Sequence, residues 1–168
     1  MATTFIKIAS VTVGSGGTAS IDFTSIPSTY TDLCLLTSLR SSTTQAWAKL
    51  QINGSDSNFT SRSLEGYGSG TPESYSRTDN LNFIALDKSS YTSNTFSNSS
   101  LYFPNYAGSN YKSISVDSVA ENNATEGIAV LFAKLWSSTS AINQLTIVPQ
   151  SGTLVQYSTA VLYGIKNS

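Results

Sequence analysis

The chain has 168 residues and a net charge of −1, and only 11% of its residues are charged, well below the usual quarter. Its polarity comes from hydroxyl groups, 31 Ser and 20 Thr, while its aromatic and β-branched residues are too numerous for a disordered chain. Nine scattered Lys and Arg form no basic stripe, so we expect neither a nucleic acid nor a membrane as a partner.

The first predicted elements form a hairpin at the N-terminus. Apolar and polar residues alternate from Phe5 to Val13, which is the period-two pattern of a strand. The glycine-rich stretch 14–17 interrupts this pattern, because glycine accepts the backbone angles of a tight turn. Ile21–Phe23 is the predicted partner strand.

Nine more short strands follow, separated by Gly, Asn, Ser or Pro. They are predicted at Leu33–Leu39, Trp47–Ile52, Phe59–Leu64, Leu81–Leu86, Leu101–Phe103, Ser113–Val119, Ile128–Trp136, Leu145–Val148 and Tyr157–Ile165. Helical spacing is weak everywhere. We therefore predict an all-β fold, an antiparallel β-sandwich that is jelly-roll-like, formed by residues 1–168 as a single domain.

Two polar segments are predicted to be long loops, Gly66–Asn80 and Ser89–Ser100, and loops of this length are often functional or mobile. Tyrosine offers a large rigid contact area with a polar tip, which suits protein and sugar surfaces. Tyrosines in or near polar loops are therefore candidate surface-binding residues: Tyr67, Tyr75, Tyr91 and Tyr106. The alternative is that these tyrosines pack at the core or its rim. Trp47 and Trp136 fall within strands and are expected in the core.

The side chains needed for common enzyme chemistry are scarce. The chain has no histidine, which removes the usual partner of a nucleophilic Ser or Cys. The single cysteine, Cys34, lies in an apolar run and is expected to be a buried thiol. Glu121 and Glu126 flank a turn-like loop and are expected to be solvated acids; with Asp117 they could offer oxygen ligands to calcium, but their spacing fits no known motif. We predict no enzyme, no cofactor and no metal.

Targeting signals are also missing. The N-terminal residues lack the basic and long apolar regions of a signal peptide. The longest apolar run, Ile128–Trp136, is far too short to cross a membrane and contains Lys134. We therefore expect synthesis in a cytoplasm and, if the protein leaves the cell, release by another route.

Three stretches resemble a known group of proteins. They are residues 8–14 leading to 26–33 (IPSTYTDL), residues 104–108 (PNYAG) with 111–114, and residues 156–160 (QYSTA) with 162–165 (LYGI). In these the chain resembles small Ser/Thr-rich virion proteins of tailed bacteriophages, especially phages of cyanobacteria and other marine bacteria. The resemblance spans nearly the whole chain and carries no catalytic motif.

The resemblance implies a location on the virion surface. One expected role is a capsid decoration or cement protein that contacts the major capsid protein or other virion proteins as a homo-oligomer, by resemblance a trimer. A near-neutral, hydroxyl-rich surface suits many copies packed side by side, since high net charge would make them repel. The alternative is the receptor-binding tip of a tail or head fibre, with the loop tyrosines holding a host glycan.

Overall fold

The computed structural model describes residues 4–81 and 83–166, in which every regular element is a strand. The strands are β1 (Phe5–Thr12), β2 (Ile21–Phe23), β3 (Asp32–Leu39), β4 (Trp47–Ile52), β5 (Phe59–Tyr67), β6 (Glu73–Arg77), β7 (Ile84–Ala85), β8 (Ser97–Phe103), β9 (Lys112–Glu121), β10 (Gly127–Trp136), β11 (Leu145–Pro149) and β12 (Thr159–Ile165). All neighbouring strands pair antiparallel.

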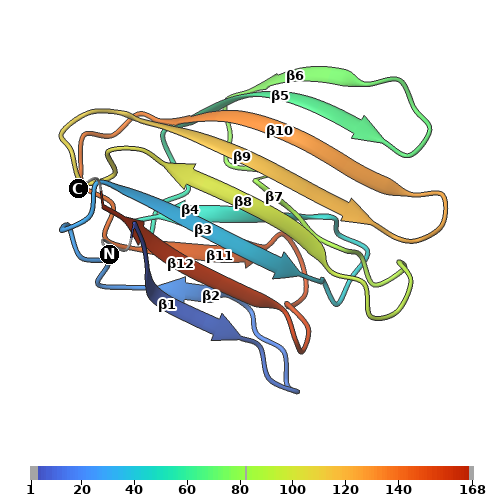
Figure 1. Cartoon of the computed structure of the whole chain (residues 1–168). Helices are drawn as coiled ribbons and strands as arrows, with labels where there is room; N and C mark the ends of the chain where they lie inside the picture. The colour runs from blue at the N-terminus through green and yellow to red at the C-terminus, as the bar shows by residue number, and fades with distance from the viewer. Residues whose placement is uncertain (1–3, 82, 167–168) are drawn as a thin grey trace.

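The strands form two sheets of unequal size. The large sheet has the order β1-β12-β3-β8-β9-β10-β5-β6, and the small sheet has the order β2-β11-β4-β7 (Figure 1). The prediction of an all-β antiparallel sandwich is confirmed. Because one sheet has eight strands and the other four, the jelly-roll-like detail is not confirmed. β7 contacts β8 and β9, so the small sheet ends near the middle of the large one and β5 and β6 extend beyond it.

Strict alternation in the long strands explains this layering. In β9, Ile114 and Val116 are buried against the small sheet, whereas Ser115 and Asp117 face outward. Alternation of this kind buries one face of an antiparallel sheet and leaves the other to solvent. The resulting core joins residues from both ends of the chain, from Val13 to Leu162.

The aromatic core residues lie where the two sheets meet. Trp47 in β4 and Phe132 in β10 pack edge to face with ring centroids 5.9 Å apart, a favourable geometry for two aromatic rings. Phe59 and Phe83 make a similar contact at 5.9 Å. The predicted burial of Trp47 and Trp136 is confirmed.

The predicted N-terminal hairpin is wrong. β1 pairs with β12 in the large sheet, whereas β2 pairs with β11 in the small sheet. The glycine-rich turn therefore carries the chain from one sheet to the other. Local alternation shows that two strands exist, but it does not show which distant strand completes each ladder.

The predicted loop at residues 66–80 is also wrong, since it contains a hairpin. β5 continues to Tyr67, and β6 pairs with it from Ser61↔Arg77 to Glu65↔Glu73. β6 lacks an apolar alternation because it is an edge strand with both faces largely exposed. Two other predicted boundaries also differ. The strand predicted at 81–86 is shortened to β7, at residues 84–85, and residue 82 lies outside the described residues. The loop predicted at 89–100 ends before residue 97, where β8 begins.

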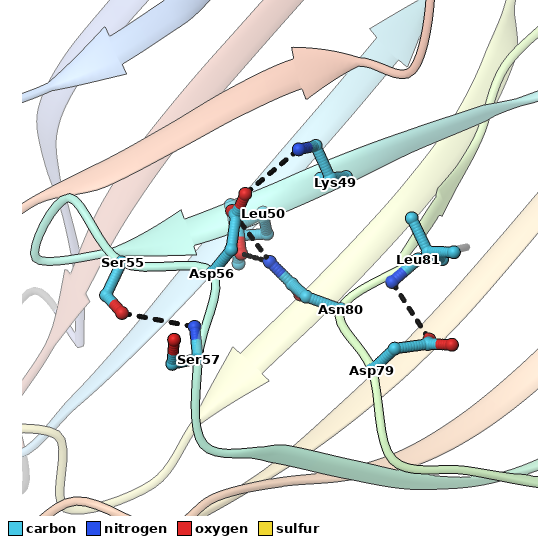
Figure 2. A network of polar contacts seen from close by, with 8 residues as sticks. All are labelled: Lys49, Leu50, Ser55, Asp56, Ser57, Asp79, Asn80 and Leu81. Atoms are coloured by element: carbon cyan, nitrogen blue, oxygen red, sulfur yellow. Dashed lines mark hydrogen bonds and ion pairs between the residues drawn. The ribbon is translucent and has the colours of Figure 1, made fainter.

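Polar contacts fix the connection from β6 to β7 against the small sheet (Figure 2). Asn80 Nδ2 donates to the Leu50 carbonyl at 2.6 Å and to Asp56 at 3.3 Å, while Lys49 forms an ion pair with Asp56 at 2.9 Å. The amide of Leu81 donates to Asp79 Oδ1 at 3.1 Å, which closes a local turn. These contacts hold the connection across the projecting end of the large sheet.

A close approach of ring and backbone occurs where the resemblance motifs meet. Gly164 in β12 lies under the ring of Tyr30, and an added Cβ would stand 2.3 Å from that ring. Tyr30 precedes β3, which pairs with β12. The absence of a side chain at residue 164 is therefore what lets the ring cover the strand.

We expect Gly164→Ala to lower the free energy of unfolding by about 1–3 kcal/mol, because the methyl group must displace the Tyr30 ring. Urea unfolding at neutral pH measures this effect. Gly16→Ala is the matched control, since nothing lies within 4 Å of its added Cβ and its φ is not positive. Equal stabilities of the two variants would contradict the packing argument.

Candidate functional site

A small cleft lies at the end of the sandwich where β5 ends and β10 begins. It has a volume of about 290 Å³. Its aromatic lining comes from Trp47, Tyr67 and Tyr91, and its rim carries Lys88 and Glu126. Two tyrosines predicted as binding residues, Tyr67 and Tyr91, are thus brought together by segments far apart in the sequence.

Arg40 holds the loop that carries Tyr91. Its guanidinium donates to the carbonyl oxygens of Tyr91 at 2.9 Å, Thr92 at 2.9 Å and Thr95 at 3.0 Å. The planar fork of Arg can satisfy several acceptors at once with little further loss of entropy. The loop that the sequence marks as long and polar is therefore pinned to the end of β3.

Tyr67 is held by a buried carboxylate. Glu65, whose side chain is fully buried, accepts hydrogen bonds from the Tyr67 hydroxyl and from Ser63 Oγ, and forms an ion pair with Arg77 at 3.2 Å. Burial and the hydrogen bond to Glu65 raise the pKa of Tyr67 well above its ordinary value. The phenol stays protonated at physiological pH, and its ring is fixed at the cleft wall.

The cleft rim carries a charge pair. Lys88 Nζ lies 2.8 Å from Glu126 Oε2 and 5.0 Å from the centre of the Tyr91 ring. The hydrogen bond to Glu126 raises the pKa of Lys88, so the ammonium is charged at neutral pH. An aromatic wall with a nearby donor and acceptor can stack on the apolar face of a sugar and bond its hydroxyls.

The second candidate surface is the outer face of the large sheet. Cross-strand pairs place Leu36, Leu131 and Leu64 in one row, interrupted by Ser100 and Asp117. Leu64 is 64% exposed and Leu131 is 57% exposed. Around them a shallow depression of about 660 Å³ is lined largely by apolar side chains and Ser hydroxyls. Exposed apolar patches of this kind often mark contact sites for other proteins.

Tyr102 forms one end of this outer face. Its hydroxyl donates to Asp32 at 2.6 Å, and this bond raises the pKa of Tyr102 to about 12. Its cross-strand neighbour Cys34 also points outward, yet it is buried as predicted. Burial raises the pKa of the Cys34 thiol, so it is protonated at neutral pH and unreactive.

The other two predicted tyrosines lie elsewhere. Tyr75 is in β6, at the free edge of the large sheet. The prediction that Tyr106 is a surface-binding residue is wrong. Tyr106 is fully buried, and its hydroxyl donates a hydrogen bond to the carbonyl oxygen of Pro27. Tyr91 is only 5% exposed, so it offers a wall of the cleft and no open surface. For Tyr106 the alternative of core packing is the one that the structure shows.

Two buried lysines have no counterpart in the sequence predictions. Lys112 donates to the carbonyl oxygens of Gly108, Asn110 and Ser140 at 2.6–2.8 Å and so holds the turn before β9. Lys134, only 1% exposed, lies 4.4 Å from the Phe83 ring centre and has no hydrogen-bond partner in the described residues. Strand alternation marks both positions as inward-facing, which is the signal that could have found them.

Within the described residues, acidic side chains and the cysteine form no group of three or more that could hold a metal ion. Glu121 and Glu126 are exposed, as expected for solvated loop acids. The same part of the chain contains no helix long and apolar enough to cross a membrane. The chain matches no known protein family and no curated protein.

Lys134 should make the free energy of unfolding depend on pH between about 8 and 10.5. Desolvation lowers its pKa from 10.5 to about 8, even though Asp79 and Glu65 favour the charged form. Between these two values the unfolded chain binds more protons than the folded chain, so the contribution of this group to stability rises with pH. Below pH 8 the burial costs about 3 kcal/mol.

We therefore expect Lys134→Met to be more stable than the wild type at pH 7, by about 1–3 kcal/mol. The advantage should shrink as the pH rises from 8 to 10, where the wild-type lysine becomes neutral. Urea unfolding of both proteins at pH 7 and pH 10 measures it. An advantage that is equal at both pH values would show that the buried ammonium is not its source.

Proposed function

We propose that this chain is a non-enzymatic surface protein of a tailed-phage virion, and that it acts as a capsid decoration or cement protein. The observation that carries the decoration role is the apolar row Leu36, Leu131 and Leu64 on the outer face of the large sheet. The viral assignment is supported by the three resemblance stretches. In this proposal the outer face contacts the major capsid protein or another virion protein.

The composition of the outer face supports a contact with protein. Around Leu64 and Leu131 lie small hydroxyl side chains such as Ser74, Ser100 and Ser115, together with the charged Arg62 and Asp117. Small polar residues around apolar anchors let a partner approach these anchors closely. The one acid in the row, Asp117, gives the contact a polar point that a partner's donor can meet.

The proposal predicts that Leu64→Ser combined with Leu131→Ser binds virions lacking the protein about 100-fold more weakly than the wild type. Two leucines that become buried in a contact contribute about 3 kcal/mol together, which is a factor of about 100. Add-back to such particles, followed by quantitative mass spectrometry, measures the bound copies. Leu81→Ser is the control, since Leu81 is an exposed leucine on the β6–β7 connection.

Copy number tests the decoration role itself. A decoration protein should be present in purified virions at the number of the major capsid protein or a simple fraction of it. A few copies per particle would overturn the decoration role. Normal binding of the double leucine variant would overturn only the assignment of the contact face.

The second candidate function is a glycan-binding fibre tip, and the cleft between Tyr67 and Tyr91 favours it. In this role the exposed ring of Tyr67 stacks on a sugar while Lys88 and Glu126 bond its hydroxyls. The protein would then be present at few copies per virion. The same copy-number measurement therefore separates the two functions.

For this second role we expect Tyr67→Ala to weaken binding to purified host surface polysaccharide at least about ten-fold, since a stacked aromatic ring contributes about 1–3 kcal/mol. Surface plasmon resonance measures the change. Tyr111→Ala is the control, because Tyr111 is an exposed tyrosine just before β9, at the end of that strand opposite the cleft. Wild-type protein that does not bind at high concentration would exclude the fibre-tip role.

A further inference from the structure

β6 is an exposed edge strand with an unused side. It pairs with β5 on one side, and in the described residues no other strand pairs with it (Figure 1). Residues 73–76 are exposed. An edge of this kind presents free N–H and C=O groups and is a template for another strand.

The register shows which backbone groups are free. The Gly68 amide donates to the Gly127 carbonyl at 3.0 Å, so even-numbered residues of β5 direct their hydrogen bonds to β10 and odd-numbered ones to β6. Ser63 pairs with Tyr75, so Tyr75 directs its own backbone groups back to β5. The N–H and C=O groups of Ser74 and Ser76 therefore point to the free edge.

The sequence of β6 is complementary to itself. Glu73-Ser74-Tyr75-Ser76-Arg77 has opposite charges at equal distances from a central tyrosine. If a second copy pairs antiparallel about Tyr75, Glu73 lies opposite Arg77 of that copy, and Ser74 lies opposite its Ser76. Both serine pairs then exchange two backbone hydrogen bonds, and opposite charges meet directly across the strands.

The side chains of β6 are already ordered for such a contact. The guanidinium of Arg77 lies 4.6 Å from the Tyr75 ring centre, and the Tyr75 hydroxyl bonds Glu73. Arg77 forms its ion pair with Glu65 through Nη2, and its side chain is 25% exposed. Its guanidinium can therefore also donate to a carboxylate of a second copy. Little side-chain freedom is lost when an ordered surface of this kind pairs.

We infer that β6 is a two-fold contact site for a second copy of this chain, joining two large sheets edge to edge through a β6–β6 pair centred on Tyr75. The contact is isologous, because the same residues serve on both sides. This inference does not depend on the proposed virion function. It also differs from the trimer that the resemblance implies, because a two-fold contact joins two copies. β6 contains neither a lysine nor an internal proline, two of the features that block edge pairing.

The register of the pair can be tested by cysteine cross-linking, since the native Cys34 is buried. Tyr75→Cys places two thiols directly opposite each other, within the Cα separation that a disulfide requires. We expect this variant to form a disulfide-linked dimer under mild oxidation. Ser74→Cys and Ser76→Cys should each cross-link poorly alone and well when mixed, because residue 74 lies opposite residue 76 of the other copy.

Sedimentation equilibrium of the full chain without added cysteines measures the association itself. We expect a reversible dimer that Ser74→Pro weakens about ten-fold or more, since proline removes an outward N–H and no bond to β5. Circular dichroism should show that this variant is folded. Glu73→Lys should also weaken the dimer, because it places two cations opposite each other.

Tyr111→Cys is the matched cross-linking control, being an exposed tyrosine far from β6 in the sequence. Cross-linking of Tyr75→Cys no faster than this control, or a wild-type protein that stays monomeric at about 100 μM, would overturn the inference. A monomer that binds an extended peptide of another protein along β6 would equally overturn it, because the occupant is then not a second copy. A dimer unaffected by Ser74→Pro would place the contact elsewhere and overturn it as well.

Discussion

The packing of a four-stranded sheet against part of an eight-stranded sheet is the constraint on which the rest of the structure depends. Each sheet buries mainly one face, because its longer strands alternate apolar and polar residues. The apolar area removed from water along this contact is the main driving force for folding.

The unequal width of the sheets explains the buried polar groups. The small sheet stops at β7, and beyond Phe59 the buried inward residues of β5 are the polar Ser61, Ser63 and Glu65. Glu65 is acceptable there because Ser63, Tyr67 and Arg77 satisfy its oxygens. Lys134 in the adjacent strand has no hydrogen-bond partner among the described residues, and its desolvation disfavours the charged form.

The few charged residues of the chain are arranged differently on each of its surfaces. On the outer face of the large sheet, small hydroxyl side chains surround exposed leucines, which suits contact with another protein surface. At the end of the sandwich, the charged residues Lys88 and Glu126 are paired beside aromatic rings. At the β6 edge, the two charges have opposite signs and equal spacing about Tyr75.

The sequence by itself determined the class of fold and much of the core. Period-two alternation marked most strands, and it marked Trp47 and Trp136 as interior, because side-chain direction in a strand depends only on local geometry. The burial of Cys34 was predicted from the apolar run around it and is confirmed, although its side chain lies on the outer face of the sheet.

Only the tertiary structure decided which strands pair and which tyrosines meet. The partners of β1 and β2 lie more than 100 residues away, and no local pattern selects among equivalent strands. β6 was missed because an edge strand needs hydrogen bonds on one side and no buried face, so it leaves no apolar period. Tyr91 lies at the cleft with Tyr67 because Arg40 binds the loop that carries Tyr91. Tyr106 lies in the core because its hydroxyl bonds Pro27, which is far away in the sequence. Loop composition is similar in both cases, so it could not distinguish them.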